Sequence, residues 1–186
     1  MATTARRLTI VELEALPEEQ PGDRHELIAG ALVVTPVPIR KHQLISGNIS
    51  FALELLVREH HLGRLYAVPT GVRLHPDTLL IPDICYVGRA KLPIIDPKVI
   101  DVAPDLVIEI LSPGTRQRDL TLKRELYERF GVQEYWIVDP VRETVMVLAL
   151  TGERYEPVPT GEEGQVRSRV LPELTLTLAD IFANVS

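Results

Sequence analysis

The amino-acid sequence predicts a mixed α/β domain in which a central β-sheet is covered by helices. Two segments carry apolar residues at three- and four-residue spacing, which is typical of amphipathic helices. Several short runs are apolar at nearly every position, which indicates strands that are covered on both faces. These segments follow one another as helix, three strands, helix and strand, so we expect helices packed on a mixed sheet.

The N-terminal part predicts a short helix and a β-hairpin. Thr9-Ile10-Val11-Glu12 has the form of a capping box, so a helix should begin there and extend to about Leu16. Ala29-Gly30 separates two short β-type runs, and glycine in such a position favours a hairpin turn. The two expected strands cover residues 25–28 and 31–34.

The middle of the chain predicts a long helix and three strands. Apolar residues recur at helical spacing from Lys41 to His61, and Gly63 is a plausible stop. The strands that follow are expected over residues 64–74, broken by Pro69 and Gly71, over 79–87, and over 105–111.

A second helix is predicted from Arg118 to Phe130. Leu122, Leu126 and Phe130 form its apolar stripe, and Gly131 ends it. The rest of the chain is predicted to be β-rich: strands over 134–138, 144–150 and 154–158, then a short strand and a helical turn within 174–183. We find no linker, so one domain spans 1–186, with a core at about 24–140 and a β-rich extension at about 141–186.

Composition limits the function classes. The formal net charge of −6 argues against a broadly basic nucleic-acid binder, but it leaves room for a local basic patch around an acidic metal site. The one cysteine, Cys85, excludes an internal disulfide and is expected to be a buried thiol, which suits a reducing cytoplasm. No apolar stretch approaches the ~20 residues that span a bilayer, and the segment from Met1 to Arg7 does not resemble a signal peptide.

Two carboxylates interrupt apolar strands. Asp83 lies in Leu80-Ile81-Pro82-Asp83-Ile84, and Glu109 lies in Val107-Ile108-Glu109-Ile110-Leu111. A buried carboxylate is costly unless it is paired, hydrogen-bonded or bound to a metal. A divalent cation would remove the repulsion between the two, and oxygen ligands suit Mg²⁺ or Mn²⁺. Alternatively, Asp83 shapes a strand end after Pro82 and Glu109 is an ordinary ion-pair partner.

Lys123 is the third candidate. It lies next to Leu122 at the edge of the core-facing stripe of the second helix, where its ammonium group can reach the sheet. A lysine beside a metal-bound water can orient that water or neutralise charge on a phosphoryl group. A solvated helix lysine is the alternative for this residue alone.

The chain resembles the PD-(D/E)xK nuclease superfamily and, within it, the "putative restriction endonuclease" family of the Uma-two type. The matching segments cover about residues 24 to 140: residues 25–30, Pro82-Asp83, 104–113 around Glu109, Lys123 with Tyr127, and 131–140. One position departs from the superfamily pattern. The usual lysine two residues after the acid is Leu111 here, and the resemblance implies that Lys123 takes its place from the following helix.

The resemblance implies a restriction-endonuclease-like core and Mg²⁺-dependent hydrolysis of phosphodiester bonds in DNA, with 5′-phosphate products. It implies Asp83, Glu109, Lys123 and Glu26 as catalytic residues, with the three acids as metal ligands, although a surface acid is the alternative for Glu26. His42 matches a family position, where it would contact substrate or cap the long helix. Residues assigned to substrate contact are His42, Arg116, Arg118 and Tyr127.

Basic residues also follow the Glu109 strand and open the long helix, where they would contact phosphates or simply be solvated. A homodimer is expected because nucleases of this kind often act in pairs. Two alternatives stay open. One is a nuclease-like scaffold that binds a nucleic acid or a protein without cutting, and the other is a metal-dependent hydrolase of a smaller phosphoester.

Overall fold

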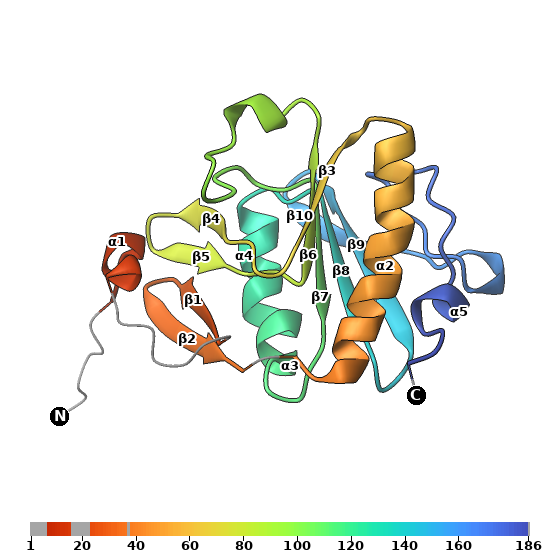
Figure 1. Cartoon of the computed structure of the whole chain (residues 1–186), viewed down its shortest axis with the longest axis horizontal. Coiled ribbons are helices and arrows are strands. Elements are labelled where there is room, and N and C mark those ends of the chain that lie inside the picture. The colour runs from red at the N-terminus through yellow and green to blue at the C-terminus, as the bar shows by residue number, and fades with distance from the viewer. Residues whose placement is uncertain (1–6, 16–22, 37, 186) are drawn as a thin grey trace.

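The computed structural model describes residues 7–15, 23–36 and 38–185, and it has an α+β architecture with two β-sheets (Figure 1). The N-terminal segment from Met1 to Arg6 and the expected helix end at Leu16 lie outside these residues. Within the described part, no helix combines the length and the apolar character that a bilayer crossing requires.

The larger sheet has six strands in the order β10-β9-β8-β7-β6-β3. Its strands are β3 (Gly63–Ala67), β6 (Ile84–Gly88), β7 (Leu106–Ile110), β8 (Glu134–Asp139), β9 (Thr144–Thr151) and β10 (Arg154–Val158). Only β7 and β8 run parallel; every other neighbouring pair is antiparallel. A parallel pair needs a crossover connection, and the helical segment between residues 116 and 129 supplies it.

The smaller sheet has four strands in the order β2-β1-β5-β4. They are β1 (Arg24–Ile28), β2 (Ala31–Thr35), β4 (Val72–His75) and β5 (Thr78–Leu80). The predicted hairpin is confirmed as β1 and β2, with Ile28 opposite Ala31. Ala29 and Gly30 have φ of 49° and 82°, which is the left-handed pair that a two-residue hairpin turn needs.

The helices cover both faces of the larger sheet. α2 (Arg40–Glu59) and α5 (Leu178–Ile181) pack on one face, and the crossover lies on the other (Figure 1). The crossover is one continuous helical path made of α3 (Arg116–Arg118), the π-helical turn η2 (Asp119–Lys123) and α4 (Arg124–Arg129). The remaining helical elements are α1 (Ile10–Glu14), η1 (Leu92–Ile94) and η3 (Glu162–Gly164).

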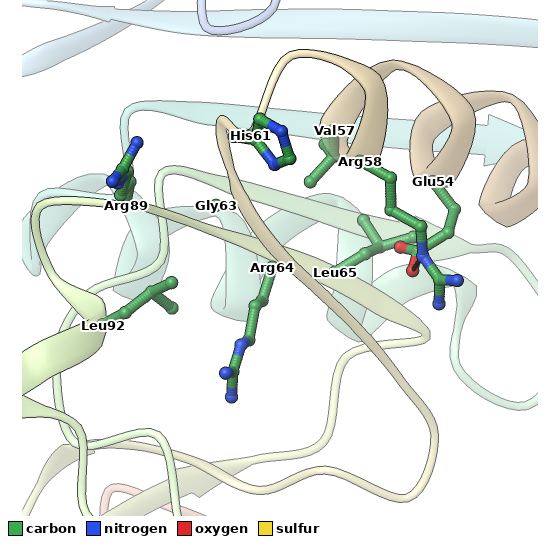
Figure 2. A pocket seen from close by; sticks show the side chains of 9 residues that line it. All are labelled: Glu54, Val57, Arg58, His61, Gly63, Arg64, Leu65, Arg89 and Leu92. Carbon is green, nitrogen blue, oxygen red and sulfur yellow. Dashed lines mark hydrogen bonds and ion pairs between the residues drawn. The ribbon is translucent and has the colours of Figure 1, made fainter.

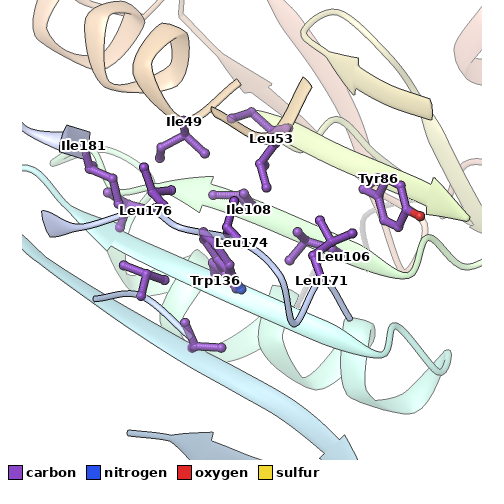
Figure 3. Packing of buried hydrophobic residues seen from close by; sticks show 14 of the residues in the cluster. Ile49, Leu53, Tyr86, Leu106, Ile108, Trp136, Leu171, Leu174, Leu176 and Ile181 are labelled. Carbon is purple, nitrogen blue, oxygen red and sulfur yellow. The ribbon is translucent and has the colours of Figure 1, made fainter. Parts of the chain in front are cut away.

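The core lies on both sides of the larger sheet. On the α2 face, Ile49 and Leu53 pack over the sheet residues Ile108 and Trp136 (Figure 3). The C-terminal segment closes this side with further apolar side chains such as Leu174. On the α4 face, Cys85 is buried as predicted, and burial raises the pKa of its thiol to about 12. Both faces are covered, which explains why β7 is buried at every position.

Several predicted elements are confirmed. Thr9 caps α1 in a capping box with Glu12, and α2 matches the long predicted helix within two residues at each end. That helix ends at Glu59 with His60 as its C-cap, however, and Gly63 begins β3 instead of stopping the helix. The C-terminal β-hairpin of β9 and β10 is also confirmed, with Arg154 opposite Thr151. The short strand expected from Leu174 is absent from the described residues, where an isolated bridge between Gln165 and Thr177 stands in its place.

The prediction of one continuous strand over 79–87 is wrong. The chain forms β5 in the smaller sheet, leaves it at Ile81-Pro82, and enters the larger sheet with β6. Pro82 explains the break, because proline cannot donate to a strand ladder and is confined to strand ends, edges and bulges. Asp83 therefore sits at the junction of the two sheets, directly before β6, and not inside a strand.

Candidate active site

The junction of the two sheets places Asp83 where three elements supply hydrogen-bond donors. Arg24 Nη1, at the start of β1, donates to Asp83 Oδ1 at 2.6 Å. On the other carboxylate oxygen, His42 Nε2 of α2 lies 3.0 Å from Oδ2, and the backbone N–H of Ile110 donates to Oδ2 at 2.7 Å. Although Asp83 is buried, both of its carboxylate oxygens thus have hydrogen-bond partners.

These donors keep Asp83 ionised. Burial alone would raise the pKa of its carboxyl group, but the hydrogen bond and charge of His42, the Arg24 guanidinium and the Ile110 N–H together outweigh burial. The pKa of Asp83 therefore lies below its ordinary value.

Glu109 lies on β7, next to Ile108, which pairs with the first residue of β6, and its surroundings differ from those of Asp83. Lys123 Nζ and the Tyr127 hydroxyl donate to Glu109 Oε1 at 2.9 and 2.8 Å. Burial raises the pKa of Glu109 well above its ordinary value; Lys123 opposes this effect, whereas the neighbouring acids Asp119, Asp83 and Glu26 add to it. One of the two central carboxyl groups is therefore ionised readily, and the other holds its proton to higher pH.

Lys123 is the centre of an acidic cluster. Its Nζ lies 2.8 Å from Glu26 Oε1, 2.9 Å from Glu109 Oε1 and 3.7 Å from Asp119 Oδ1. Burial would lower the pKa of Lys123, but the charges of Glu109, Glu26 and Asp119 raise it above its ordinary value. The ammonium group is therefore charged and fixed among three carboxylates.

The π-helical turn η2 brings Lys123 to this position. Leu122, assigned to the core-facing stripe from the sequence, is 40% exposed, whereas Lys123 is 3% exposed. Asp119, Lys123 and Tyr127 form the buried stripe instead, at a spacing of four residues. The wider turn shifts the helix face by about one residue, and π turns of this kind are frequent at functional sites.

Sequence analysis missed Asp119 and Arg24. Asp119 is 1% exposed, and its Oδ1 is buried without a hydrogen-bond partner within the described part of the chain. Its one signal in the sequence is the spacing of four residues before Lys123, which places both side chains on one helix face. Arg24 carried no signal, because its partner Asp83 is 59 residues away along the chain.

A cavity of about 630 Å³ opens onto this cluster. Its polar lining includes Glu26, Asp83, Glu109 and Lys123, and the candidate substrate residues His42 and Arg118 also line it. The other two candidates lie differently. Arg116 Nη1 donates to Asp139 Oδ2 at 2.8 Å, and Tyr127 is fully buried with its hydroxyl on Glu109.

The residues present fit a divalent cation by their chemistry. Four buried carboxylates, of Glu26, Asp83, Glu109 and Asp119, form ion pairs with only two permanent cations, Arg24 and Lys123, among the described residues. The excess of carboxyl groups over cations and the all-oxygen donor set suit Mg²⁺. Across the described chain, however, no three acidic, His or Cys side chains are gathered in ligand positions, so binding requires a carboxylate to turn from its present partner.

Tyr127 offers a direct test of how Glu109 is held. Tyr127→Phe removes the hydroxyl that donates to Glu109 Oε1, and we expect it to lower the free energy of unfolding by about 1–3 kcal/mol. Urea denaturation followed by tryptophan fluorescence measures this loss. Tyr155→Phe is the matched control, because the Tyr155 hydroxyl donates to the neutral backbone carbonyl of Val132. Equal losses in the two variants would contradict a charge-supported role of Tyr127.

Comparison with known proteins identifies a family and similar solved structures. The model of a family described as "Uma2: Putative restriction endonuclease" matches residues 10–179. A crystal structure described as that of "a putative nuclease belonging to DUF820 from Anabaena variabilis ATCC 29413" is similar to the chain with a TM-score of 0.79 and 26% sequence identity, over 96% of this chain and 99% of that one. No curated protein gives a significant match.

Proposed function

Because the chain belongs to the "putative restriction endonuclease" family, we propose that it is an endonuclease that hydrolyses phosphodiester bonds in DNA with Mg²⁺ or Mn²⁺ as cofactor. The observation that carries the proposal is the meeting of three residues at one cavity: Asp83 from the junction directly before β6, Glu109 from β7 and Lys123 from the crossover helix. Two neighbouring buried acids and a buried lysine supply the groups that phosphodiester hydrolysis needs.

Each residue of the cluster has a proposed role. Asp83 and Glu109 hold the metal, with Glu26 as a further ligand, and a metal bound there supplies Lewis-acid polarisation of the scissile phosphate. Lys123 stabilises the negative charge that develops on the phosphoryl oxygens, from the helix that follows Glu109 and not from position 111. Tyr127 positions Glu109 through its hydroxyl and does not touch substrate.

The cavity also supplies cations for the substrate backbone. Arg24 and Arg118 reach it, and both have a buried guanidinium Nε with no hydrogen-bond partner among the described residues. Their remaining donors are shared with Asp83 and Thr35. Arginine binds phosphate through several donors at once, so we assign these two residues, with His42, to the phosphate next to the cleaved bond.

The proposal is tested by incubating supercoiled plasmid with the protein in Mg²⁺, in Mn²⁺ or in EDTA. We expect nicking in both metals and none in EDTA, and we expect Asp83→Asn to reduce the rate about a hundredfold or more, which corresponds to about 2.7 kcal/mol of transition-state stabilisation. Asp101→Asn is the control, because Asp101 pairs with Arg73 on the surface away from the cavity. Its rate should equal that of the wild type.

Other outcomes select the alternatives. If cleavage survives Asp83→Asn, the cleavage does not take place at the site around Asp83. Metal binding without cleavage of DNA, but with cleavage of model phosphoesters, would favour the hydrolase of a smaller phosphoester. No metal binding and no cleavage would favour the non-cutting scaffold. Sedimentation equilibrium of the same preparation tests the expected homodimer, which stays a prediction.

A further inference from the structure

A second hollow lies at the opposite end of α2 from the candidate active site. It has a volume of about 850 Å³, and α2, β3, the end of β6 and η1 line it. Figure 2 shows its residues at the turn that joins α2 to β3. His42 and Arg58 are 16 residues apart on α2, so the hollow and the active site are separated by roughly 24 Å along the helix axis.

The lining of this hollow is basic, in contrast to the protein as a whole. Arg58, His61, Arg64 and Arg89 are all exposed there, and Glu54 is the one acid among the lining residues. Glu54 is already paired with Arg58 on the next turn of α2. Figure 2 shows this pair on the helix, to one side of Arg64 and Arg89. The other cations therefore face a hollow without a carboxylate for them.

Strand register brings Arg64 and Arg89 together. Arg64 lies opposite Val87 in the antiparallel pairing of β3 with β6, and Arg89 comes two residues after Val87. The pairing therefore brings the backbones of the two arginines close together where β3 and β6 border the hollow, and Figure 2 shows their side chains extending in different directions. Gly63 allows this close approach, because a Cβ there would lie 2.2 Å from the Val87 carbonyl oxygen.

Neither arginine has a partner in the described part of the chain: the side chains of Arg64 and Arg89 form no hydrogen bond or ion pair there. Three arginines near the candidate active site, in contrast, each have a partner: Arg24 pairs with Asp83, Arg116 with Asp139 and Arg118 with Thr35. Like charges that border one hollow without a counter-ion repel each other, and a bound anion lowers that cost.

We propose that this hollow is a second phosphate-binding site, in which Arg64 and Arg89, with His61, hold the phosphodiester backbone of a nucleic acid away from the cleaved bond. Guanidinium groups bind phosphate oxygens through paired hydrogen bonds, and contacts of this kind position a nucleic acid without reading its sequence. The choice of a nucleic acid over a small phosphate rests on the proposed function. Protection of the exposed strand edge would explain a cation on β3, but not Arg89, which follows the end of the interior strand β6.

The test measures binding and not cleavage. Fluorescence anisotropy in EDTA follows a labelled DNA duplex of about 24 base pairs, which is long enough to reach both sites, and a hairpin of about five base pairs, which is too short. For the long duplex, we expect Arg64→Gln/Arg89→Gln to weaken binding about tenfold and to reduce the slope of log K against log salt by about two. The short hairpin should bind the variant and the wild type equally.

Arg129→Gln/Arg167→Gln is the matched control, because it removes the same charge from exposed arginines outside the hollow. Equal binding of the long duplex by the Arg64/Arg89 variant and the wild type would overturn the proposal. The test also adds inorganic phosphate at a concentration equal to that of the phosphate groups in the duplex. If this displaces the duplex, the nucleic-acid assignment is overturned in favour of a small anion. Because the binding assay contains no metal, a protein that does not cleave DNA can still give the expected binding result. A wild type that neither binds nor cleaves DNA would contradict both the proposed nuclease function and the second phosphate-binding site.

Discussion

Lys123→Met should lower the free energy of unfolding by about 3–5 kcal/mol when it is measured in EDTA. The substitution keeps much of the volume of the side chain but removes the one cation that pairs with Glu26, Glu109 and Asp119. Three buried carboxylates would then face each other without a counter-charge, and each is at most 3% exposed. Urea denaturation followed by far-UV circular dichroism measures the loss.

A divalent cation should restore part of this stability. In the proposed function Mg²⁺ binds the folded cluster and not the unfolded chain, so its addition should raise the unfolding midpoint of Lys123→Met by more than it raises that of the wild type. Lys91→Met is the control: Lys91 pairs with Asp105 at 2.7 Å, but both side chains are partly solvated, so the loss should be about 1 kcal/mol and insensitive to Mg²⁺. If the two variants lost equal stability, Lys123 would not be the charge centre that the structure indicates.

Glu109→Gln should separate function from stability. The amide oxygen can still accept hydrogen bonds from Lys123 and Tyr127, but the side chain can no longer bind a metal as a carboxylate. We expect metal-dependent nicking to fall about a hundredfold or more. At the same time, the free energy of unfolding in EDTA should rise by about 1 kcal/mol at about pH 8, because one charge of a crowded acidic cluster is gone.

The pH dependence follows from the raised pKa of Glu109. The folded wild type keeps the Glu109 proton at pH values where the unfolded chain has already lost it, so the stability of the wild type falls as pH rises from the ordinary glutamate pKa to the raised value. Glu109→Gln lacks this loss, so the two unfolding curves should converge near about pH 4 and separate above it.

Glu134→Gln is a control of opposite sign. The buried Glu134 carboxylate accepts hydrogen bonds from Trp136, Ser168, Arg169 and Val170, and an amide group would turn a donor towards some of them. This variant should lose stability at about pH 8, by about 1–3 kcal/mol. If Glu109→Gln lost a similar amount of unfolding free energy, the Glu109 carboxylate would be stabilised as well as that of Glu134. That result would contradict the prediction that the acidic cluster disfavours the charge of Glu109.

The local elements of the fold were accessible from the sequence. Thr9 with Glu12 predicted the cap of α1, Ala29-Gly30 predicted the β1–β2 turn, and helical spacing predicted α2. These features depend on residues that are a few positions apart, so a short window of sequence contains the physics that decides them. The same holds for Asp83 and Glu109, because an acid within an apolar run must find a partner or a metal wherever the run is buried.

The arrangement of the site was decided by tertiary structure. Pro82 signalled a strand end, yet only the pairing of distant strands shows that the chain changes sheets there and delivers Asp83 to the junction. Arg24, which neutralises Asp83, lies 59 residues away from it along the chain. The π-helical turn that buries Lys123 in place of Leu122 is likewise outside the reach of an ideal 3.6-residue pattern.

The sequence by itself therefore determined which residues are costly to bury, since that cost depends on side-chain chemistry and on the apolar character of the neighbours. Tertiary structure decided which partners offset this cost. Arg24 and His42 do so at Asp83, and Lys123 and Tyr127 do so at Glu109. Asp119 Oδ1 has no hydrogen-bond partner among the described residues. Electrostatic energy depends on distances in space, and those distances exist only after the two sheets and the crossover helix have packed together.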